Sequence, residues 1–238
     1  MYDQLKEELV KWKLKQLQKP SVFNRNSKRV QRKVNEYIPK KVHDVVTESI
    51  KKMVQATIAG NEFFPKKTYS KNLTLLEKES ELKNVIKAYQ KTAAIEGVGT
   101  GAGGIFLGLA DFPLLLGIKM KFLFEAAALY GFDTTKYEER IFLLHVFQLA
   151  YSSEEYKASL LKTIENWELN KPTDVDWKTF QQEYRDYIDL VKLFQVVPGI
   201  GAIVGGVANY QLVNHLGECV KYSFRMRLLQ NHDIPIGE

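Results

Sequence analysis

The sequence predicts an all-α protein, a multi-helix bundle that contains two similar glycine-rich helical hairpins. Apolar residues recur at steps of three and four along almost the whole chain, which is the spacing of one face of an α-helix. No window shows the alternation of apolar and polar residues that is typical of a half-buried strand. With 238 residues, 45% of them hydrophobic, the chain can bury a sizeable core, and we expect one domain over residues 1–238.

Residues 1–60 are expected to form basic amphipathic helices. The first helix covers residues 3–18, before Pro20. Its apolar face has a central stripe, formed by Leu5, Leu9, Trp12 and Gln16, and a widening row, formed by Val10, Leu14 and Leu17. A second helical pattern runs over residues 28–58, with a kink or break at Pro39, and ends at Gly60. A basic amphipathic helix either lies in a membrane interface or docks on the rest of the fold.

A third expected helix, residues 73–95, leads into the first glycine-rich stretch. Between residues 97 and 118 only Asp111 is charged, and this length approaches the roughly 20 apolar residues that a membrane span needs. Asp111 followed by Pro113 has the pattern of a helix N-cap with proline in the first turn. We therefore expect a glycine-rich helix, a break, and a second helix over residues 112–130 that Gly131 ends.

The C-terminal half contains two capping-box patterns and the second glycine-rich stretch. Thr135-Lys136-Tyr137-Glu138 predicts the start of one helix, and Ser152-Ser153-Glu154-Glu155 predicts another over residues 153–167. An aromatic helix is expected from Thr173 or Asp174 to Pro198. The second glycine-rich stretch then leads into a final helix that ends near residue 230.

The two glycine-rich stretches, within residues 93–131 and 196–230, resemble one another. Each is a run of small residues that becomes apolar and reaches one polar side chain, Asp111 in the first and Asn209 in the second. Glycine at helical spacing lets another backbone approach closely. The candidate packing glycines are Gly101, Gly104, Gly108, Gly201 and Gly206. We expect two hairpins that pack together or insert in lipid.

Asp111 and Asn209 are the candidate polar pair. In the structural interpretation, which we prefer, each side chain caps a helix or bonds exposed backbone across a glycine hairpin, because an unpaired buried polar group costs about 1–3 kcal/mol. In the functional interpretation, the two side chains form a polar site between the hairpins, for a proton or a ligand.

The basic charge of the chain lies in its N-terminal region. Residues 1–52 hold 14 lysines and arginines against 6 acidic residues, whereas the whole chain has a net charge of +6. This asymmetry suits an anionic surface, either lipid headgroups or nucleic acid, although a solvated helix face is an equally good explanation. The candidate anionic-surface residues are Lys11, Lys15, Arg29, Arg32, Lys33, Lys40 and Lys41. Nucleic acid is the least favoured partner because no recognisable nucleic-acid-binding motif is present.

Motifs for cofactors, metals and covalent catalysis are missing from the sequence. The stretch Gly99-Thr100-Gly101-Ala102-Gly103-Gly104 lacks the Gly-Lys-Ser/Thr of a phosphate loop and a preceding strand. The 4 histidines have no metal-ligand spacing, and Cys219 has no evident activating base. We therefore expect no cofactor and no metal. The single cysteine and an N-terminus without an apolar signal region predict a cytoplasmic protein.

The motif Gly101-Ala102-Gly103-Gly104, followed by Gly108-Leu109-Ala110-Asp111-Phe112-Pro113, resembles a hallmark of the EcsC family, bacterial proteins named for a gene that neighbours those of an ABC transporter. Further similarities are Tyr130-Gly131-Phe132-Asp133 before Glu138-Glu139-Arg140, and Pro198-Gly199-Ile200-Gly201-Ala202 before Asn209. The resemblance covers most of the chain. It implies a cytoplasmic-side or membrane-associated protein of undetermined biochemical activity, with a functional link to a transporter.

These observations predict a non-enzymatic protein that binds an anionic membrane surface or a membrane-protein partner such as an ABC transporter. It is expected to be peripheral or partly embedded at the inner face of the cell membrane. The alternative is a cytoplasmic hydrolase-type enzyme that uses Asp111, His145 or His215 in an apolar helical pocket. That alternative requires these groups to meet within hydrogen-bond reach around a cavity.

Overall fold

The computed structural model describes residues 2–18, 40–60, 64, 67–70, 72–101, 112–185 and 201–230. For residues 40–43, 97–101 and 201–206 it describes the helical backbone only. Within these ranges the regular secondary structure is helical and contains no strand, which confirms the all-α prediction.

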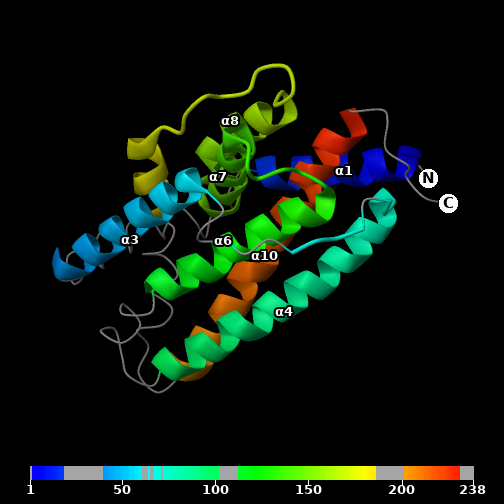
Figure 1. The fold of residues 1–238 in the computed structure, drawn as a ribbon. Helices are drawn as coiled ribbons and strands as arrows, with labels where there is room; N and C mark the ends of the chain where they lie inside the picture. Colours follow the sequence, from blue (N-terminus) through cyan, green and yellow to red (C-terminus); the bar gives the residue numbers. More distant parts are fainter. Residues whose placement is uncertain are drawn as a thin grey trace.

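Long helices account for most of the described residues (Figure 1). They are α1 (Tyr2–Leu17), α3 (Lys40–Ala59), α4 (Leu75–Gly101), α6 (Phe112–Tyr130), α7 (Tyr137–Tyr151), α8 (Glu154–Glu165) and α10 (Gly201–Gln230). Residues 177–185 are also helical, at the start of the predicted aromatic helix. The expected breaks after residues 58, 130 and 151 therefore lie within a few residues of the observed ones.

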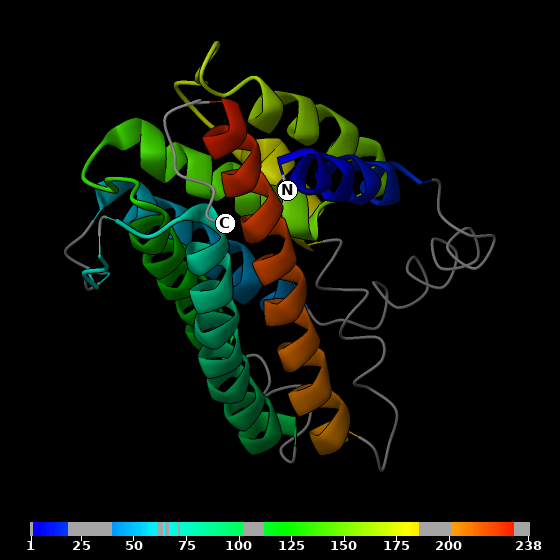
Figure 2. The ribbon, with the colours of Figure 1, turned by 90° about the vertical axis from the view of Figure 1, so that its right-hand side faces the viewer.

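α6 and α7 form the centre of the bundle. Every residue of α7 from Ile141 onward is buried, and α7 contacts α3, α8 and α10. α6 is buried along most of its length and contacts α3 and α4. α4 and α10 run side by side and extend beyond the other labelled helices at one end (Figure 2). α3 and α4 thus pack on α6, whereas α1 packs on α8 and α10.

Glycines in the left-handed region end two helices, as the sequence predicts. Gly131 has φ +90°, and Phe132 N donates to Ala127 O at 2.9 Å, which is the bond of a Schellman cap. Gly60 has φ +100° and ends α3, where its N–H donates to Ala56 O at 3.1 Å. Any residue with a Cβ would be strained at these two positions.

Neither of the two predicted capping boxes forms, but a capping box forms at the start of α4, where none was predicted. The N-cap residues of α7 and α8, Lys136 and Ser153, make no side-chain cap bond. At the start of α4, Glu77 Oε2 accepts from Thr74 N at 2.8 Å, and Glu77 N donates to Thr74 Oγ1 at 3.3 Å. The pattern Thr-x-x-Glu is present there too, so the motif alone does not decide where a box forms.

α1 docks on the bundle through its central stripe and leaves its second row exposed. Leu5, Trp12 and Gln16 are buried, and the Trp12 ring stacks on Tyr222 with centroids 4.7 Å apart. The three residues expected to widen the stripe do not pack inside: Val10 is 52% exposed, Leu14 59% and Leu17 45%. The widening row of the apolar face therefore lies outside the fold, because the helix contacts α8 and α10 along a narrow line.

Two buried arginines in the last turns of α10 join helices that are distant in sequence. Arg225 binds both carboxylate oxygens of Glu79 in α4, at 2.7 and 2.6 Å, and Glu8 of α1 at 2.9 Å. Arg227 binds both oxygens of Glu139 in α7, at 2.6 and 3.0 Å. Removal of one partner of such a buried pair typically costs about 3–5 kcal/mol, because a charge is left buried without its counter-charge.

Candidate functional site at the glycine-rich end of α4 and α10

α4 and α10 form an antiparallel pair joined by polar contacts. Gln90 Nε2 donates to Asn214 Oδ1 at 3.0 Å, and Asn209 Nδ2 donates to Ala93 O at 3.2 Å. Between these bonds, Ala93 and Val213 are fully buried. The residue numbers rise along α4 and fall along α10, so the helices are antiparallel. The two bonds together set the register of the pair.

Close approach of the two helices depends on a glycine that the sequence analysis did not single out. A Cβ at Gly217 would lie 2.5 Å from Ile86 Cδ1 and 2.7 Å from Ile86 Cγ1, so only glycine fits there without a shift of Ile86. At Gly117 of α6, in contrast, a Cβ would meet nothing within 4 Å. A glycine inside an otherwise regular helical pattern is the signal that could have identified Gly217.

The glycine-rich stretches meet at the far end of this pair. Continuation of the register brings residues 97–101 of α4 alongside residues 201–206 of α10, and both views show these helix ends together (Figures 1 and 2). Among the candidate packing glycines, Gly101 is the last residue of α4, and Gly201 and Gly206 lie in the first turns of α10. Gly104 and Gly108 lie outside the described residues. We call residues 95–101 and 201–210 the glycine-rich end.

Large apolar side chains at the glycine-rich end face solvent. Ile95 is 72% exposed, Val207 56% and Tyr210 41%. Within this end Glu96 follows Ile95 directly, whereas no lysine, arginine, aspartate or glutamate occurs over residues 97–110 or over residues 193–217. Exposed apolar side chains beside a stretch without charged residues are typical of a surface that contacts lipid or another protein.

Asn209 of α10 donates through its amide to the backbone carbonyl of Ala93, which lies inside α4 close to the point where the glycines begin. Asp111 lies outside the described residues, so the proposed pairing of Asp111 with Asn209 stays a prediction.

The structure describes the side chains of only two of the candidate anionic-surface residues. Lys11 and Lys15 are exposed on α1, where Lys11 lies 2.6 Å from Glu7 and Lys15 lies 4.0 Å from Glu218. Lys40 and Lys41 lie in the first turn of α3, of which only the backbone is described. Arg29, Arg32 and Lys33 lie outside the described residues.

Among the described histidines, His145 is buried and His215 is partly buried; Cys219 is buried too, and all three have shifted pKa values. Burial lowers the pKa of His145, whose Nδ1 lies 2.9 Å from Ile141 O, and it lowers the pKa of His215 to about 4. Burial raises the pKa of Cys219 to about 12, which makes a thiolate nucleophile unfavourable. In the part of the chain that the structure describes, no hydrogen bond joins His145 to His215. Asp111, the third group of the hydrolase alternative, lies outside the described residues, so that alternative stays a prediction.

Two charged side chains of α6 have partners that sequence analysis could not identify. Lys119 is fully buried, donates to Tyr184 Oη at 3.1 Å and lies 4.2 Å from the centroid of Tyr151, and burial lowers its pKa to about 7. Glu125 accepts bonds from Lys67, Tyr69 and Tyr89 at 2.6, 2.7 and 2.9 Å. Each group anchors a distant segment to α6, and the apolar sequence around them gave no sign of these partners.

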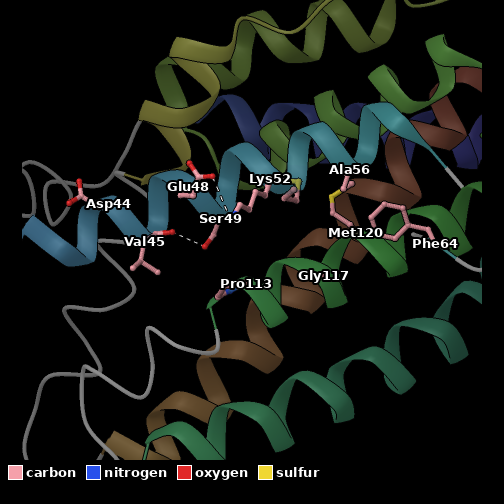
Figure 3. Close-up of a pocket in the computed structure, with 11 residues that line it drawn as sticks. Asp44, Val45, Glu48, Ser49, Lys52, Ala56, Phe64, Pro113, Gly117 and Met120 are labelled. Atoms are coloured by element: carbon pink, nitrogen blue, oxygen red, sulfur yellow. Dashed lines mark hydrogen bonds and ion pairs between the residues drawn. The ribbon is translucent and has the colours of Figure 1, made fainter. Parts of the chain in front are cut away.

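A groove of about 640 Å³ lies between α3 and α6 (Figure 3). Val45 and Ser49 of α3 point toward α6, whereas Asp44 and Glu48 point away from it. Gly117 forms part of the groove wall, where a side chain would be accommodated. The lining residues that the structure describes include none of the predicted site residues.

A search of the described helices for membrane spans finds none that is both long and apolar enough to cross a bilayer. Within the same residues, no group of three histidine, cysteine, aspartate or glutamate side chains is placed to hold a metal ion.

Comparison with known proteins assigns most of the chain to one family. The model of the EcsC protein family matches residues 3–229. Protein EcsC of Bacillus subtilis (strain 168) is 58% identical over 226 residues, which cover 95% of each chain. The uncharacterized protein YdbA of the same organism is 31% identical over 141 residues, which cover 57% of this chain and 52% of YdbA. No solved structure matches.

Proposed function

Because this chain belongs to the EcsC protein family, we propose that it is a non-enzymatic protein that attaches to the inner face of the cell membrane by its glycine-rich end. The observation that carries this proposal is the exposure of Ile95, Val207 and Tyr210 at an end where residues 97–110 and 193–217 hold no lysine, arginine, aspartate or glutamate. The end enters the interfacial region and does not cross the bilayer.

The energetics favour shallow insertion. Full burial of an aliphatic or aromatic side chain contributes about 1.5–3 kcal/mol, so the exposed parts of Ile95 and Val207 contribute somewhat less each. A tyrosine such as Tyr210 suits the membrane–water boundary, where its ring meets acyl chains and its hydroxyl meets water. Interfacial elements reach about 5–10 Å into the boundary between headgroups and acyl chains. Glycines keep the inserted part narrow, because they let α4 and α10 approach closely.

Electrostatic attraction to anionic lipid supports the insertion. The basic residues of the N-terminal region include Lys11, Lys15, Arg29, Arg32, Lys33, Lys40 and Lys41. Each lysine or arginine near an anionic membrane contributes about 1 kcal/mol, and this contribution falls as salt screens it. Attraction then concentrates the protein at the surface, and the apolar end retains it there.

A membrane-protein partner forms the second part of the proposal. The family resemblance implies a functional link to an ABC transporter, and attachment at the inner face would bring this protein to the cytoplasmic side of such a transporter. Its role there would be accessory binding.

Vesicle flotation of the purified full-length chain tests attachment. The wild type is expected to float with vesicles that contain phosphatidylglycerol and to stay bound at high salt. The double variant Ile95→Asp/Val207→Asp is expected to lose the salt-resistant fraction, because two charges enter the apolar layer. Leu169→Asp, at a leucine that is 86% exposed elsewhere, is the matched control and should float as the wild type does.

Three results would count against this proposal. Binding that disappears at high salt and is unchanged in the double variant would assign attachment to the basic residues alone. Equal loss in Leu169→Asp would indicate a general effect of added negative charge. A wild type that ignores anionic vesicles at every salt concentration would remove membrane attachment altogether.

A further inference from the structure

α1 has two apolar rows, and only one of them is used inside the fold. The docked row contains Leu5 and Trp12, whereas Val10, Leu14 and Leu17 form the outward row. These three residues are spaced by four and then three positions, which is the spacing of a coiled-coil seam. The same seam continues toward the N-terminus through Glu7 and Asp3. The outward face is therefore patterned for another helix.

Charges beside the outward row restrict what can pair with it. Lys6 and Lys13 each precede a seam residue, Glu7 and Leu14, and Lys11 follows the seam residue Val10. These are the flanking positions that set partner choice in coiled coils. A second copy of α1 would bring lysines against lysines in either orientation, so a self-pair is disfavoured. A partner helix with acidic flanking residues would match all three positions.

A lipid surface fits this face less well than a helix does. Asp3 and Glu7 lie on the seam itself and would be repelled by anionic headgroups. α1 also crosses the C-terminal half of α10, where Lys15 meets Glu218 and Trp12 stacks on Tyr222. Glu218 is eleven residues from Val207, which corresponds to about 16 Å along the helix. The glycine-rich end and α1 therefore present two separate surfaces.

We propose that the outward face of α1, formed by Val10, Leu14 and Leu17 and flanked by Lys6, Lys11 and Lys13, docks an amphipathic helix of a protein partner that carries acidic residues beside its apolar seam. The present partner of Lys11 does not prevent this, because Lys11 pairs with Glu7 on the exposed surface and such pairs contribute little. Lys13 is only 25% exposed and pairs with Glu165 of α8, so its ammonium group must leave that pair to meet a partner helix.

Binding of designed peptides by the full-length protein in solution tests the proposal without lipid. One labelled peptide has leucine at both seam positions and glutamate at both flanking positions, and the control peptide replaces each glutamate with lysine. Fluorescence anisotropy is expected to show at least tenfold tighter binding of the glutamate peptide. Leu14→Gln should weaken that binding at least tenfold, whereas Leu114→Gln, at an exposed leucine of α6, should not change it.

A charge reversal distinguishes specific helix pairing from nonspecific hydrophobic binding. Lys11→Glu is expected to weaken binding of the glutamate peptide and to strengthen binding of the lysine peptide. Because Trp167 and Trp177 also emit, the Trp12 signal is the difference between each variant and its Trp12→Phe counterpart, and this signal shows whether α1 remains docked on Tyr222. Equal binding of both peptides, or no binding of either, would overturn the proposal. None of these outcomes depends on whether the glycine-rich end inserts in a membrane.

Discussion

The contact between Gly217 and Ile86 makes a matched pair of glycine substitutions informative. Gly217→Ala places a Cβ 2.5 Å from Ile86 Cδ1, whereas Gly117→Ala places one where nothing lies within 4 Å. Both changes should raise the free energy of unfolding by about 1 kcal/mol through helix propensity, because alanine loses less backbone entropy on folding than glycine does. Only Gly217→Ala adds the cost of overpacking, about 1–3 kcal/mol. The difference between the two variants in free energy of unfolding is therefore expected to be about 1–3 kcal/mol, with Gly217→Ala the less stable.

Urea unfolding of the two variants, followed by circular dichroism, measures this difference. The double variant Gly217→Ala/Ile86→Ala should lose less free energy of unfolding than the sum of the losses in the two single variants. The two residues share one contact, so their effects are not additive. Gly117→Ala is expected to be at least as stable as the wild type. Equal stability of the two glycine variants would show that the close approach of α4 and α10 does not constrain position 217.

Three further outcomes follow from buried charges and helix caps. Because burial lowers the pKa of Lys119 from 10.5 to about 7, the unfolded chain binds a proton there that the folded chain lacks between these values. The free energy of unfolding should therefore rise with pH across this window in the wild type and rise less in Lys119→Met, as thermal melts at several pH values would show. Arg225→Met should lower the free energy of unfolding by about 3–5 kcal/mol, and Arg225→Met/Glu79→Met should restore part of it in denaturant titrations. Thr74→Ala should cost about 0.5–2 kcal/mol by the same assay, whereas Ser153→Ala should have little effect because its side chain makes no cap bond.

Local signals predicted much of the fold. The three- and four-residue spacing gave the helices, and Gly60 and Gly131 gave two of their ends, because a left-handed residue is a local requirement. The sequence also identified the glycine-rich stretches. It did not show that these stretches meet in an antiparallel pair, since that depends on contacts such as the one from Asn209 to Ala93, 116 residues apart.

Partners across the bundle could not be predicted because they depend on tertiary packing. Arg225 and Glu79 are separated by 146 residues, and nothing near either residue marks the other. Lys119 reads as a charge that would end an apolar segment, yet it is buried beside Tyr184. The exposure of one apolar row of α1 could not be predicted for the same reason. Periodicity identifies apolar residues, whereas the neighbouring helices determine which of them are covered.

The position of the two arginines near the end of α10 bears on how the protein is made. Arg225 holds α1 and α4, and Arg227 holds α7, so segments synthesised early depend on the helix that leaves the ribosome after all the other described ones. Until then, Glu79 and Glu139 lack their counter-charges, and the apolar faces of α4 and α7 lack the surface that covers them. Early segments normally fold first during translation. Here the bonds that join α1, α4 and α7 to α10 form only once α10 has emerged, so these segments expose their uncovered apolar and charged groups until then.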